Sequence, residues 1–350
     1  MNELLDRRRF LSATSASLTA AALASITPRL LRAAPTTAPT TAAAMPKSPL
    51  FRDPIFDGPT DPTIIYNRDA RQWWMFYTAR RANVDTEGAA WVHGTDIGIA
   101  SSADGGRSWL YRGIAQGLNV QPGRNTYWAP EIIWDNGVYH MYVSYITGVP
   151  TAWTGDRDIL HYVSSNLWDW EMVGPLSLSS HRVIDACVWP LPAGGWRMWY
   201  KDEANKSHIY AADSANLMEW NVVGPVITNR GQEGPNVFRH AGAYWMVTDM
   251  WSGLFVYRSA DLTTWKHQPT VLLATLGTRA GDNAIGHHAF MLSQGDDAFI
   301  FYFTEPDKRH ARVQVAALDV QDDQLTCDRD RAFAMDLSPE KTATLRGGSS

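Results

Sequence analysis

GPNVFRHAGAYWMVTDM, residues 234–250, joins an apolar run, a short turn at RHAG and a second run rich in aromatic residues. Two apolar and aromatic runs on either side of a glycine-containing turn are typical of an antiparallel β-hairpin. The stretch therefore predicts a hairpin. It decides the fold because the chain repeats it.

Four other stretches show the same order of strand, turn and aromatic-rich strand. They are DPTIIYNRDARQWWMFYTA (61–79), APEIIWDNGVYHMYVSY (129–145), DACVWPLPAGGWRMWYKDE (185–203) and HHAFMLSQGDDAFIFYFTE (287–305). No helical period dominates residues 50–335. The pattern therefore indicates an all-β protein.

A second element follows each of the first four hairpins. It begins with Ser or Asp and ends near a Trp, in SSADGGRSWLY (101–111), SSNLWDWEMVG (164–174), DSANLMEWNVVG (213–224) and SADLTTWKHQP (259–269). The tryptophans lie 61, 50 and 45 residues apart. A repeat of this length with about four strands per unit is typical of propeller blades, so we predict a five-bladed β-propeller in one domain. A β-sandwich of unrelated hairpins is the alternative, but it would lack such a repeat.

The composition limits the partners and the redox chemistry. The 350 residues carry a net charge of −5 and no basic block, which argues against nucleic-acid binding. Sixteen tryptophans suit both an aromatic core and a surface for sugar rings. Neither Cys187 nor Cys327 belongs to a CxxC pair, so no zinc site is indicated, and Cys187 is predicted to be a buried free thiol.

The first residues have the pattern of an export signal. Arg7-Arg8-Arg9-Phe10-Leu11 resembles a twin-arginine motif and precedes a weakly apolar Ala/Ser/Leu run. We expect a signal peptide at 1–34, a Pro/Thr/Ala linker at 35–49, the propeller at 50–340 and a disordered tail at 341–350. The apolar run is too short and polar to span a membrane, and no Cys follows it. We therefore predict a periplasmic or extracellular protein without a membrane anchor, whose oligomeric state the sequence does not indicate.

Polar residues stand at the start of each hairpin, where inner strands of a propeller converge on the central channel. They are Asp61, Glu131, Asp185, Glu233 (one residue ahead of the common register), and His287 with His288. Carboxylates in one channel shift one another's pKa values apart, so that one group acts as an acid and another as a base. Hydrolysis of a glycosidic bond needs that division.

These residues lie in motifs that resemble glycoside hydrolase family 43 and its propeller relatives. Asp61-Pro62-Thr63-Ile64 is similar to the motif of the general base, Ile184-Asp185-Ala186 to that of the orienting aspartate, and Glu233-Gly234-Pro235 to that of the general acid. Trp128-Ala129-Pro130 and Gly286-His287 match the family's blade-two and blade-five motifs. The resemblance covers about residues 50–320, one motif per blade.

The resemblance implies hydrolysis with inversion of the anomeric carbon. Asp61 would activate a water, Glu233 would protonate the leaving oxygen, and Asp185 would hold Glu233 in position and tune its acidity. It also implies an axial water or a structural Ca²⁺ beside His287, with no cofactor required for catalysis. The expected substrate is a carbohydrate, with arabinofuranosides and xylosides favoured.

Several roles stay open at this point. His287-His288-Ala289 departs from the family's G-H-G, so His288 is a second candidate for the acid and a substrate-binding residue. Glu131 would line the pocket or point along its blade to an arginine. Trp128, Trp153 and Trp251 are candidate sugar platforms, with core packing as the other reading. SSADGGRSW resembles a sialidase Asp-box, which we interpret as a structural turn.

Two other classes of function are compatible with the pattern. The chain could be a carbohydrate-binding propeller that has lost catalysis, since one fold hosts both functions. It could also be an interaction scaffold without a ligand. Three convergent carboxylates favour the enzyme over both. The insertion ARRANVDTEGAAWVHGTDIG (79–98) is longer than a simple connection and is predicted to wall the pocket.

Overall fold

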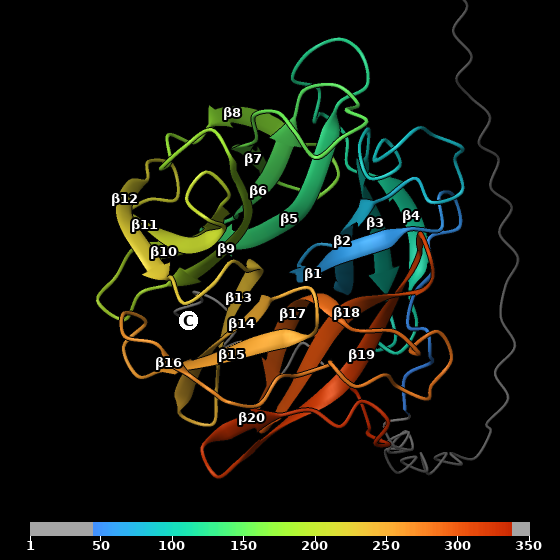
Figure 1. Ribbon diagram of the computed structural model, residues 1–350, viewed down its shortest axis with the longest axis vertical. Coiled ribbons are helices and arrows are strands. Elements are labelled where there is room, and N and C mark those ends of the chain that lie inside the picture. Colours follow the sequence, from blue (N-terminus) through green and yellow to red (C-terminus); the bar gives the residue numbers. More distant parts are fainter. Residues whose placement is uncertain (1–44, 338–350) are drawn as a thin grey trace, which may run out of the picture. The chain divides into compact units, whose positions relative to one another are not determined.

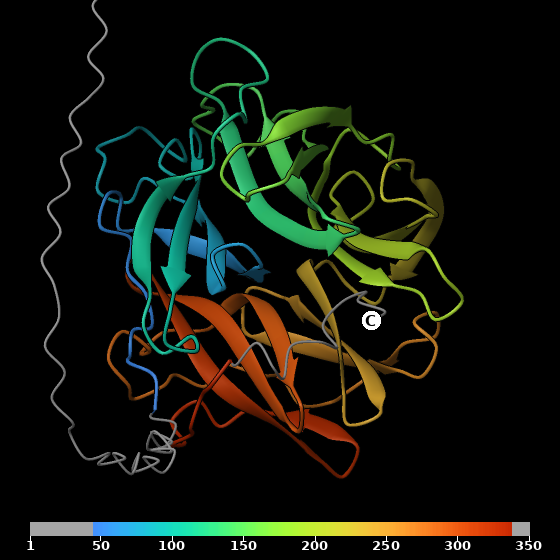
Figure 2. The same ribbon diagram turned by 180° about the vertical axis from the view of Figure 1, so that it is seen from behind.

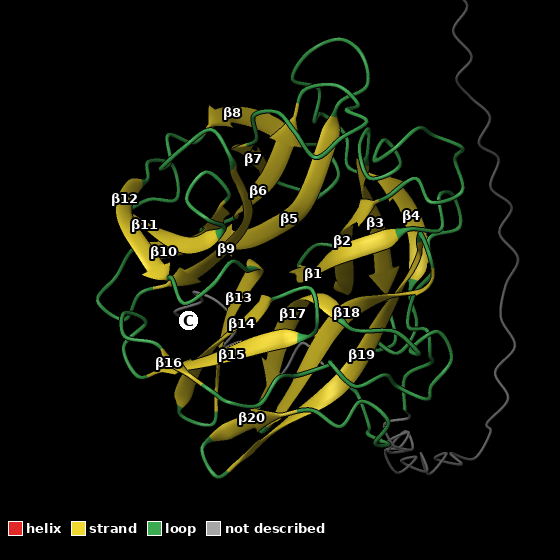
Figure 3. Cartoon of the chain, viewed as in Figure 1, coloured by secondary structure: helices red, strands yellow, loops and turns green. Residues whose placement is uncertain are grey.

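The computed structural model describes residues 45–337, and these form five four-stranded antiparallel sheets without a helix. The sheets surround a common axis as the blades of a propeller (Figure 1), and the view from behind shows the same ring (Figure 2). Figure 3 shows that loops alone join the strands. The predicted five-bladed all-β fold is confirmed. The predicted signal peptide, most of the predicted linker and the predicted tail lie outside the described residues.

Each blade is one continuous segment of chain, with its strands in sequence order from the axis outward. Blades 1 and 2 contain β1 (Pro59–Asn67), β2 (Gln72–Ala79), β3 (Asp96–Ser102), β4 (Leu110–Ile114), β5 (Thr126–Asp135), β6 (Val138–Ile146), β7 (Asp158–Ser164) and β8 (Glu171–Pro175). Blades 3 and 4 contain β9 (Val183–Pro190), β10 (Trp196–Asp202), β11 (His208–Ser214), β12 (Asn221–Ile227), β13 (Glu233–His240), β14 (Ala243–Asp249), β15 (Leu254–Ser259) and β16 (Lys266–His267). Blade 5 contains β17 (His287–Gln294), β18 (Asp297–Asp307), β19 (His310–Gln321) and β20 (Gln324–Thr326).

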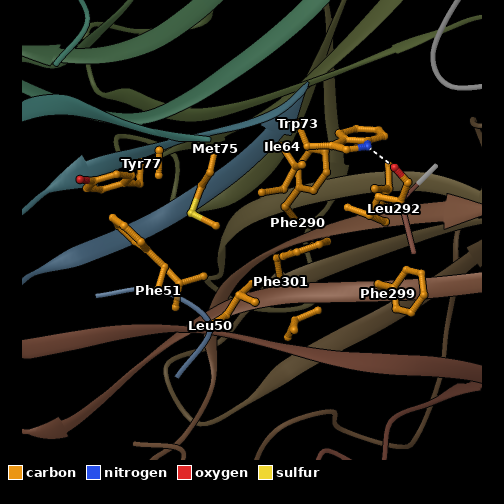
Figure 4. Close-up of a cluster of buried hydrophobic side chains, with 14 of the residues drawn as sticks. Leu50, Phe51, Ile64, Trp73, Met75, Tyr77, Phe290, Leu292, Phe299 and Phe301 are labelled. Carbon is orange, nitrogen blue, oxygen red and sulfur yellow. Dashed lines mark hydrogen bonds between the residues drawn. The ribbon is translucent and has the colours of Figure 1, made fainter. Parts of the chain in front are cut away.

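The hydrophobic core is divided among the interfaces between neighbouring blades. Successive residues of a strand point to opposite faces of its sheet. In β2, Trp73 and Met75 therefore pack against blade 5, whereas Trp74 and Phe76 pack against blade 2. Figure 4 shows the cluster between blades 5 and 1. Because both faces of each blade are covered, the middle strands are largely apolar, as the aromatic-rich halves of the hairpins predict.

The ring closes where the start of the described chain meets blade 5. Leu50 N donates to Val313 O at 2.9 Å, and Phe51 forms a bridge with the same residue. Asp57 adds ion pairs to Arg52 at 2.5 Å and to Arg312 at 2.9 Å. No strand is shared between the sheets of blades 1 and 5. These contacts therefore hold the two blades together.

The second repeated element is a turn between the third and fourth strands of a blade. In blade 1, Asp104 Oδ1 accepts hydrogen bonds from Ser102 Oγ at 2.8 Å and from Ser108 N at 3.0 Å. In blade 2, Asn166 Oδ1 accepts in the same way from Trp168 N at 2.8 Å. The Asp-box-like segment is therefore a structural turn, as expected. Cys187 is a buried thiol that forms no disulfide within the described residues, also as predicted.

The described residues contain no helix with the length and apolar character needed to cross a membrane.

Candidate active site

Each inner strand carries a β-bulge near its start, and this bulge sets the direction of the axial side chains. The register shifts follow Thr60, Trp128 and the equivalent positions of the other blades. One residue of each bulge has a positive φ: Asp61 (52°), Ala129 (47°), Asp185 (62°), Gly234 (54°) and His288 (29°). A left-handed backbone costs about 1–2 kcal/mol for a residue with a side chain, and such strain is often found at functional sites. Glu233 and His287 therefore stand one residue ahead of the bulge, and the predicted offset of Glu233 is confirmed.

A side chain of the preceding blade accepts a hydrogen bond from the bulge amide in three cases. Thr78 Oγ1 accepts from Ala129 N at 2.8 Å, and Ser144 Oγ accepts from Asp185 N at 3.0 Å. Asp249 Oδ2 accepts from His288 N at 3.0 Å.

In blade 3 the equivalent position, paired with Ile184, holds Lys201, which cannot accept a hydrogen bond. Asp185 Oδ2 accepts from Gly234 N instead, at 3.1 Å. The ammonium group of Lys201 is thereby left to contact carboxylates in the pocket.

The inner ends of the blades enclose a pocket of about 470 Å³. It is lined by every predicted catalytic residue and by most predicted binding residues: Asp61, Asp185, Glu233, Trp128, Trp153, Trp251, His287 and His288. The repeat thus brings residues from all five blades together, as the sequence predicted. Val92 also lines the pocket, so the insertion at 79–98 contributes to its wall as expected.

Glu131 is the exception among the predicted substrate-binding residues, and its assignment requires correction. Its side chain is buried and does not line the pocket, and Glu131 Oε1 accepts a hydrogen bond from Val188 N at 2.9 Å. The bulge at Ala129 turns the following residues of β5 toward blade 3. Glu131 therefore links blades 2 and 3 through the backbone of β9.

Glu233 is held directly by two side chains. Lys201 Nζ lies 2.7 Å from Glu233 Oε2, and Trp251 Nε1 donates to Glu233 Oε1 at 2.8 Å. Trp251, predicted as a sugar platform, is therefore also a positioning residue for the carboxylate. Its side chain remains available to a ligand because Trp251 is 48% exposed.

Asp185 acts on Glu233 through the backbone of the next residue, Gly234. A Cβ at Gly234 would lie 2.9 Å from Cγ of His288, so both the positive φ and the close packing require glycine here. The predicted role of Gly234 in aiming the carboxylate thus has a physical basis.

Asp61 is buried and stays ionised. Burial by itself would raise its pKa, but the His288 imidazole, the Arg80 guanidinium and nearby hydroxyl groups together lower it below the ordinary value. His288 Nδ1 lies 3.3 Å from Asp61 Oδ1, and Thr60 Oγ1 donates to Asp61 Oδ2 at 3.0 Å. A carboxylate that remains deprotonated at neutral pH is suited to accept a proton from water.

Asp185, unlike Asp61, has a raised pKa. Burial raises its pKa to about 7, and the Glu233 and Asp61 carboxylates add to the rise, while His288 and Lys201 oppose it. Burial lowers the pKa of His288, but Asp61, Asp185 and Glu233 outweigh that effect and raise it. The pocket therefore holds one ionised carboxylate and one carboxyl group that carries a proton near neutral pH, which is the separation that acid–base chemistry needs.

His287 lies beside the axial channel and pairs with Asp249, with Nδ1 at 3.0 Å from Oδ2. A Ca²⁺ beside His287, as the resemblance implies, would have to take most of its six to eight oxygen ligands from water. Asp249 Oδ2 is already shared between His287 and the backbone N–H of His288. In the part of the chain that the structure describes, no group of three or more His, Cys, Asp or Glu side chains is arranged to hold a metal ion.

Sequence reasoning missed the cations of the pocket, which are Arg80, Arg157, Arg182 and Lys201. The positions of two of these cations could have been inferred from the sequence. Arg80 and Lys201 lie at the ends of the aromatic strands of blades 1 and 3, and those ends must reach the same face as the starts of the inner strands. Arg157 and Arg182 lie in connections just before β7 and β9, where no repeated pattern marks them.

Comparison with known proteins identifies relatives by structure alone, since no family model and no curated protein sequence matches the chain. A thermostable family-43 glycoside hydrolase superimposes with a TM-score of 0.64 at 18% identity, over 81% of this chain and 99% of that one. A GH43 β-1,3-galactosidase with galactodeoxynojirimycin gives 0.61 at 13% identity, over 83% and 100%. A GH43 β-xylosidase/α-arabinofuranosidase from a compost microbial metagenome, in complex with xylotriose, gives 0.61 at 14% identity, over 82% and 97%. These likenesses establish the fold.

Proposed function

We propose that this protein is an exported glycoside hydrolase that cleaves a poly- or oligosaccharide with inversion. The observation that carries the proposal is the convergence of three carboxyl groups in one pocket, two of which have opposite pKa shifts. Three carboxyl groups from blades 1, 3 and 4 line one cavity, and the pKa of Asp61 is lowered while that of Asp185 is raised to about 7. Inverting hydrolysis needs one ionised and one protonated carboxyl group on the two sides of the scissile bond.

In the proposed reaction, Asp61 takes a proton from a water molecule as that water attacks the anomeric carbon. The bond between the anomeric carbon and the glycosidic oxygen breaks, and Glu233 gives its proton to the departing oxygen. Lys201 and Trp251 fix the orientation of Glu233. Asp185 holds the adjacent backbone and is the neighbouring group that carries a proton near neutral pH.

The proposed substrates are arabinofuranosides and xylosides. Arabinofuranosides and xylosides are favoured because two neighbours are named as a β-xylosidase and as a β-xylosidase/α-arabinofuranosidase. The exposed rings of Trp153 and Trp251 suit stacking against a sugar. Export rests on the twin-arginine-like pattern at residues 7–11.

His288 is the second candidate for the general acid. Its contacts favour a different role, because its Nδ1 pairs with Asp61 at 3.3 Å and it lies against Gly234. We therefore assign His288 to keep Asp61 ionised. Sugar binding without catalysis is the second candidate function, which the exposed rings of Trp153 and Trp251 at the pocket favour.

Sugar release from a glycan panel, with aryl glycosides alongside, tests the proposal. Wild type should hydrolyse at least one glycan, and Glu233→Gln should lose that activity but retain part of it on aryl glycosides with good leaving groups. Glu219→Gln, an exposed carboxylate of blade 3, serves as the control and should match wild type. Sugar binding by folded wild-type protein without any hydrolysis would instead establish the non-catalytic function.

A further inference from the structure

The wall of the pocket formed by blades 2 and 3 gathers three cations around one carboxylate. Arg157 Nη1 contacts Glu203 Oε2 directly, Arg182 Nη2 lies 3.5 Å from the same oxygen, and Lys201 Nζ lies 3.1 Å from Glu203 Oε1. All four side chains line the pocket. We call Arg157, Arg182, Lys201 and Glu203 the rim cluster.

Main-chain hydrogen bonds fix the rim cluster in place. Arg157 and Arg182 form a parallel bridge, in which Arg157 N donates to His181 O at 2.8 Å and Val183 N donates to Arg157 O at 3.0 Å. Glu203 N donates to Arg182 O at 2.8 Å. The three backbones are therefore tied together, which keeps their side chains converging on one place.

The charges of the rim cluster do not balance. The second carboxylate that contacts it is Glu233, through Lys201 at 2.7 Å, so three cations face two carboxylates. When Glu233 carries the proton that it delivers in the proposed reaction, one carboxylate is left. Of the other acids of the pocket, Asp61 pairs with His288, Asp249 with His287, and Glu305 with Arg80. Asp185 accepts a hydrogen bond from Gly234 N and adds a longer-range attraction to Lys201, without a direct ion pair to the rim cluster.

Arg157 makes the imbalance costly. Its side chain is 2% exposed, and its Nε has no hydrogen-bond partner among residues 45–337. Arg157 is paired with Glu203 through Nη1, but a buried guanidinium whose Nε–H has no acceptor is incompletely compensated, which favours a further anion near the cluster.

We propose that the rim cluster binds an oxyanion, a carboxylate or a sulfate ester, on the sugar that leaves. The inference rests on the proposed function, because the contact of Lys201 with Glu233 is what defines the leaving-group side. Arg182 keeps 45% of its side chain exposed toward this ligand, and guanidinium groups pair with oxyanions through directed hydrogen bonds. Trp153, 58% exposed on the same pocket, offers the apolar face of its ring.

Calorimetric titration with matched monosaccharides tests the proposal. The probes are methyl β-D-glucuronide against methyl β-D-glucoside, and methyl β-D-galactoside 6-sulfate against methyl β-D-galactoside. At least one oxyanion-bearing sugar should bind wild type on the order of 10-fold more tightly than its neutral partner. This advantage should shrink as the salt concentration rises. The two pairs distinguish a carboxylate from a sulfate ester.

Arg182→Gln should abolish the preference for the charged sugar. Lys206→Gln removes a cation from an exposed position in the loop that follows Glu203; Lys206 does not line the pocket, and the variant should keep the preference. Equal affinity for charged and neutral sugars, no measurable binding of the charged sugars at millimolar concentration, or an undiminished preference in Arg182→Gln would overturn the proposal.

Hydrolysis of activated aryl glycosides by wild type is measured separately. Hydrolysis without a charge preference would remove the rim cluster from recognition and leave the proposed function intact. A charge preference without any hydrolysis would support recognition by the rim cluster and contradict the proposed function.

Discussion

His288 in the axial pocket and His161 inside blade 2 are both removed from water, yet their environments favour opposite charges. His288 leaves 18% of its side chain exposed and lies among Asp61, Asp185 and Glu233, which raise its pKa against the effect of burial. His161 is fully buried, with Nε2 at 3.0 Å from Nδ1 of His140, and burial with the neighbouring imidazole lowers its pKa to about 3. Its ring stacks on Tyr142 at 4.7 Å.

The two regions differ in whether they hold charged groups. The interior of blade 2 keeps an uncharged imidazole pair that packs like an aromatic core. The inner ends of the blades keep charges that neighbouring charges compensate. Burial acts in the same direction on both histidines, and the carboxylates decide the outcome. The predictions below test this contrast, beginning with the largest effect.

Asp61→Asn should lower hydrolysis by about 100- to 10,000-fold, because it removes the general base. It should also lower the pKa of His288, since the Asp61 carboxylate helps to raise it. Steady-state kinetics and an NMR titration of His288 check the two effects. Asp69→Asn, an exposed aspartate of blade 1, is the control. If the pKa of His288 stays unchanged in Asp61→Asn, the assigned partnership is wrong.

Lys201→Met should reduce kcat/KM by on the order of 10-fold, because Glu233 loses a charged hydrogen-bond donor. The pH profile gives a more specific readout. Lys201 opposes the rise in the pKa of Asp185, so its removal should raise that pKa further and extend the alkaline limb of the profile to higher pH through the coupling of Asp185 to Glu233. Loss of activity with an unmoved alkaline limb would assign Lys201 a purely structural role.

Acid should destabilise the protein through the His140–His161 pair. The pKa of His161 is about 3 in the folded state against an ordinary value of 6.5, so the unfolded chain binds more protons between these values. The stabilisation is complete above pH 6.5 and is lost as the pH falls. Between pH 6.5 and 4 the free energy of unfolding should decrease by about 2–3 kcal/mol from this site.

Denaturant unfolding at several pH values measures this dependence. His161→Gln should flatten it, whereas His181→Gln should not, because Asp158 raises the pKa of this exposed histidine and so gives it the opposite pH dependence. Equal slopes in wild type and His161→Gln would show that His161 is not the residue responsible.

The smallest effects concern the bulges themselves. Gly234→Ala should cost about 1–2 kcal/mol of stability, because it places a side chain at a φ of 54° and against His288. Ala129→Gly, at the equivalent position of blade 2, should change stability by less than about 1 kcal/mol, since relief of strain offsets the added chain entropy. Thermal unfolding checks both. Equal losses of stability in the two variants would contradict the cost assigned to placing a side chain at Gly234.

Most of the fold was predictable because each blade is encoded locally. The aromatic strands alternate between the two blade interfaces, and the Ser-led turns recur with their tryptophans, so the repeat is visible without any long-range contact. Asp61, Asp185 and Glu233 were predictable for the same reason, since equivalent starts of inner strands must converge. Glu131 was misassigned because Ala129, two residues earlier, occupies the position equivalent to Asp61 and Asp185, so Glu131 lies beyond the bulge and faces blade 3.

The sequence by itself determined the number of blades, the position of the pocket and the carboxyl groups that enter it, because a repeated local pattern specifies equivalent places around an axis. The tertiary structure alone decided the charge of each group and its partners. Lys201 comes to Glu233, and Arg157 comes to Glu203, across blade boundaries. A pKa depends on burial and on charges within a few ångströms. Here those charges come from segments far apart in the chain.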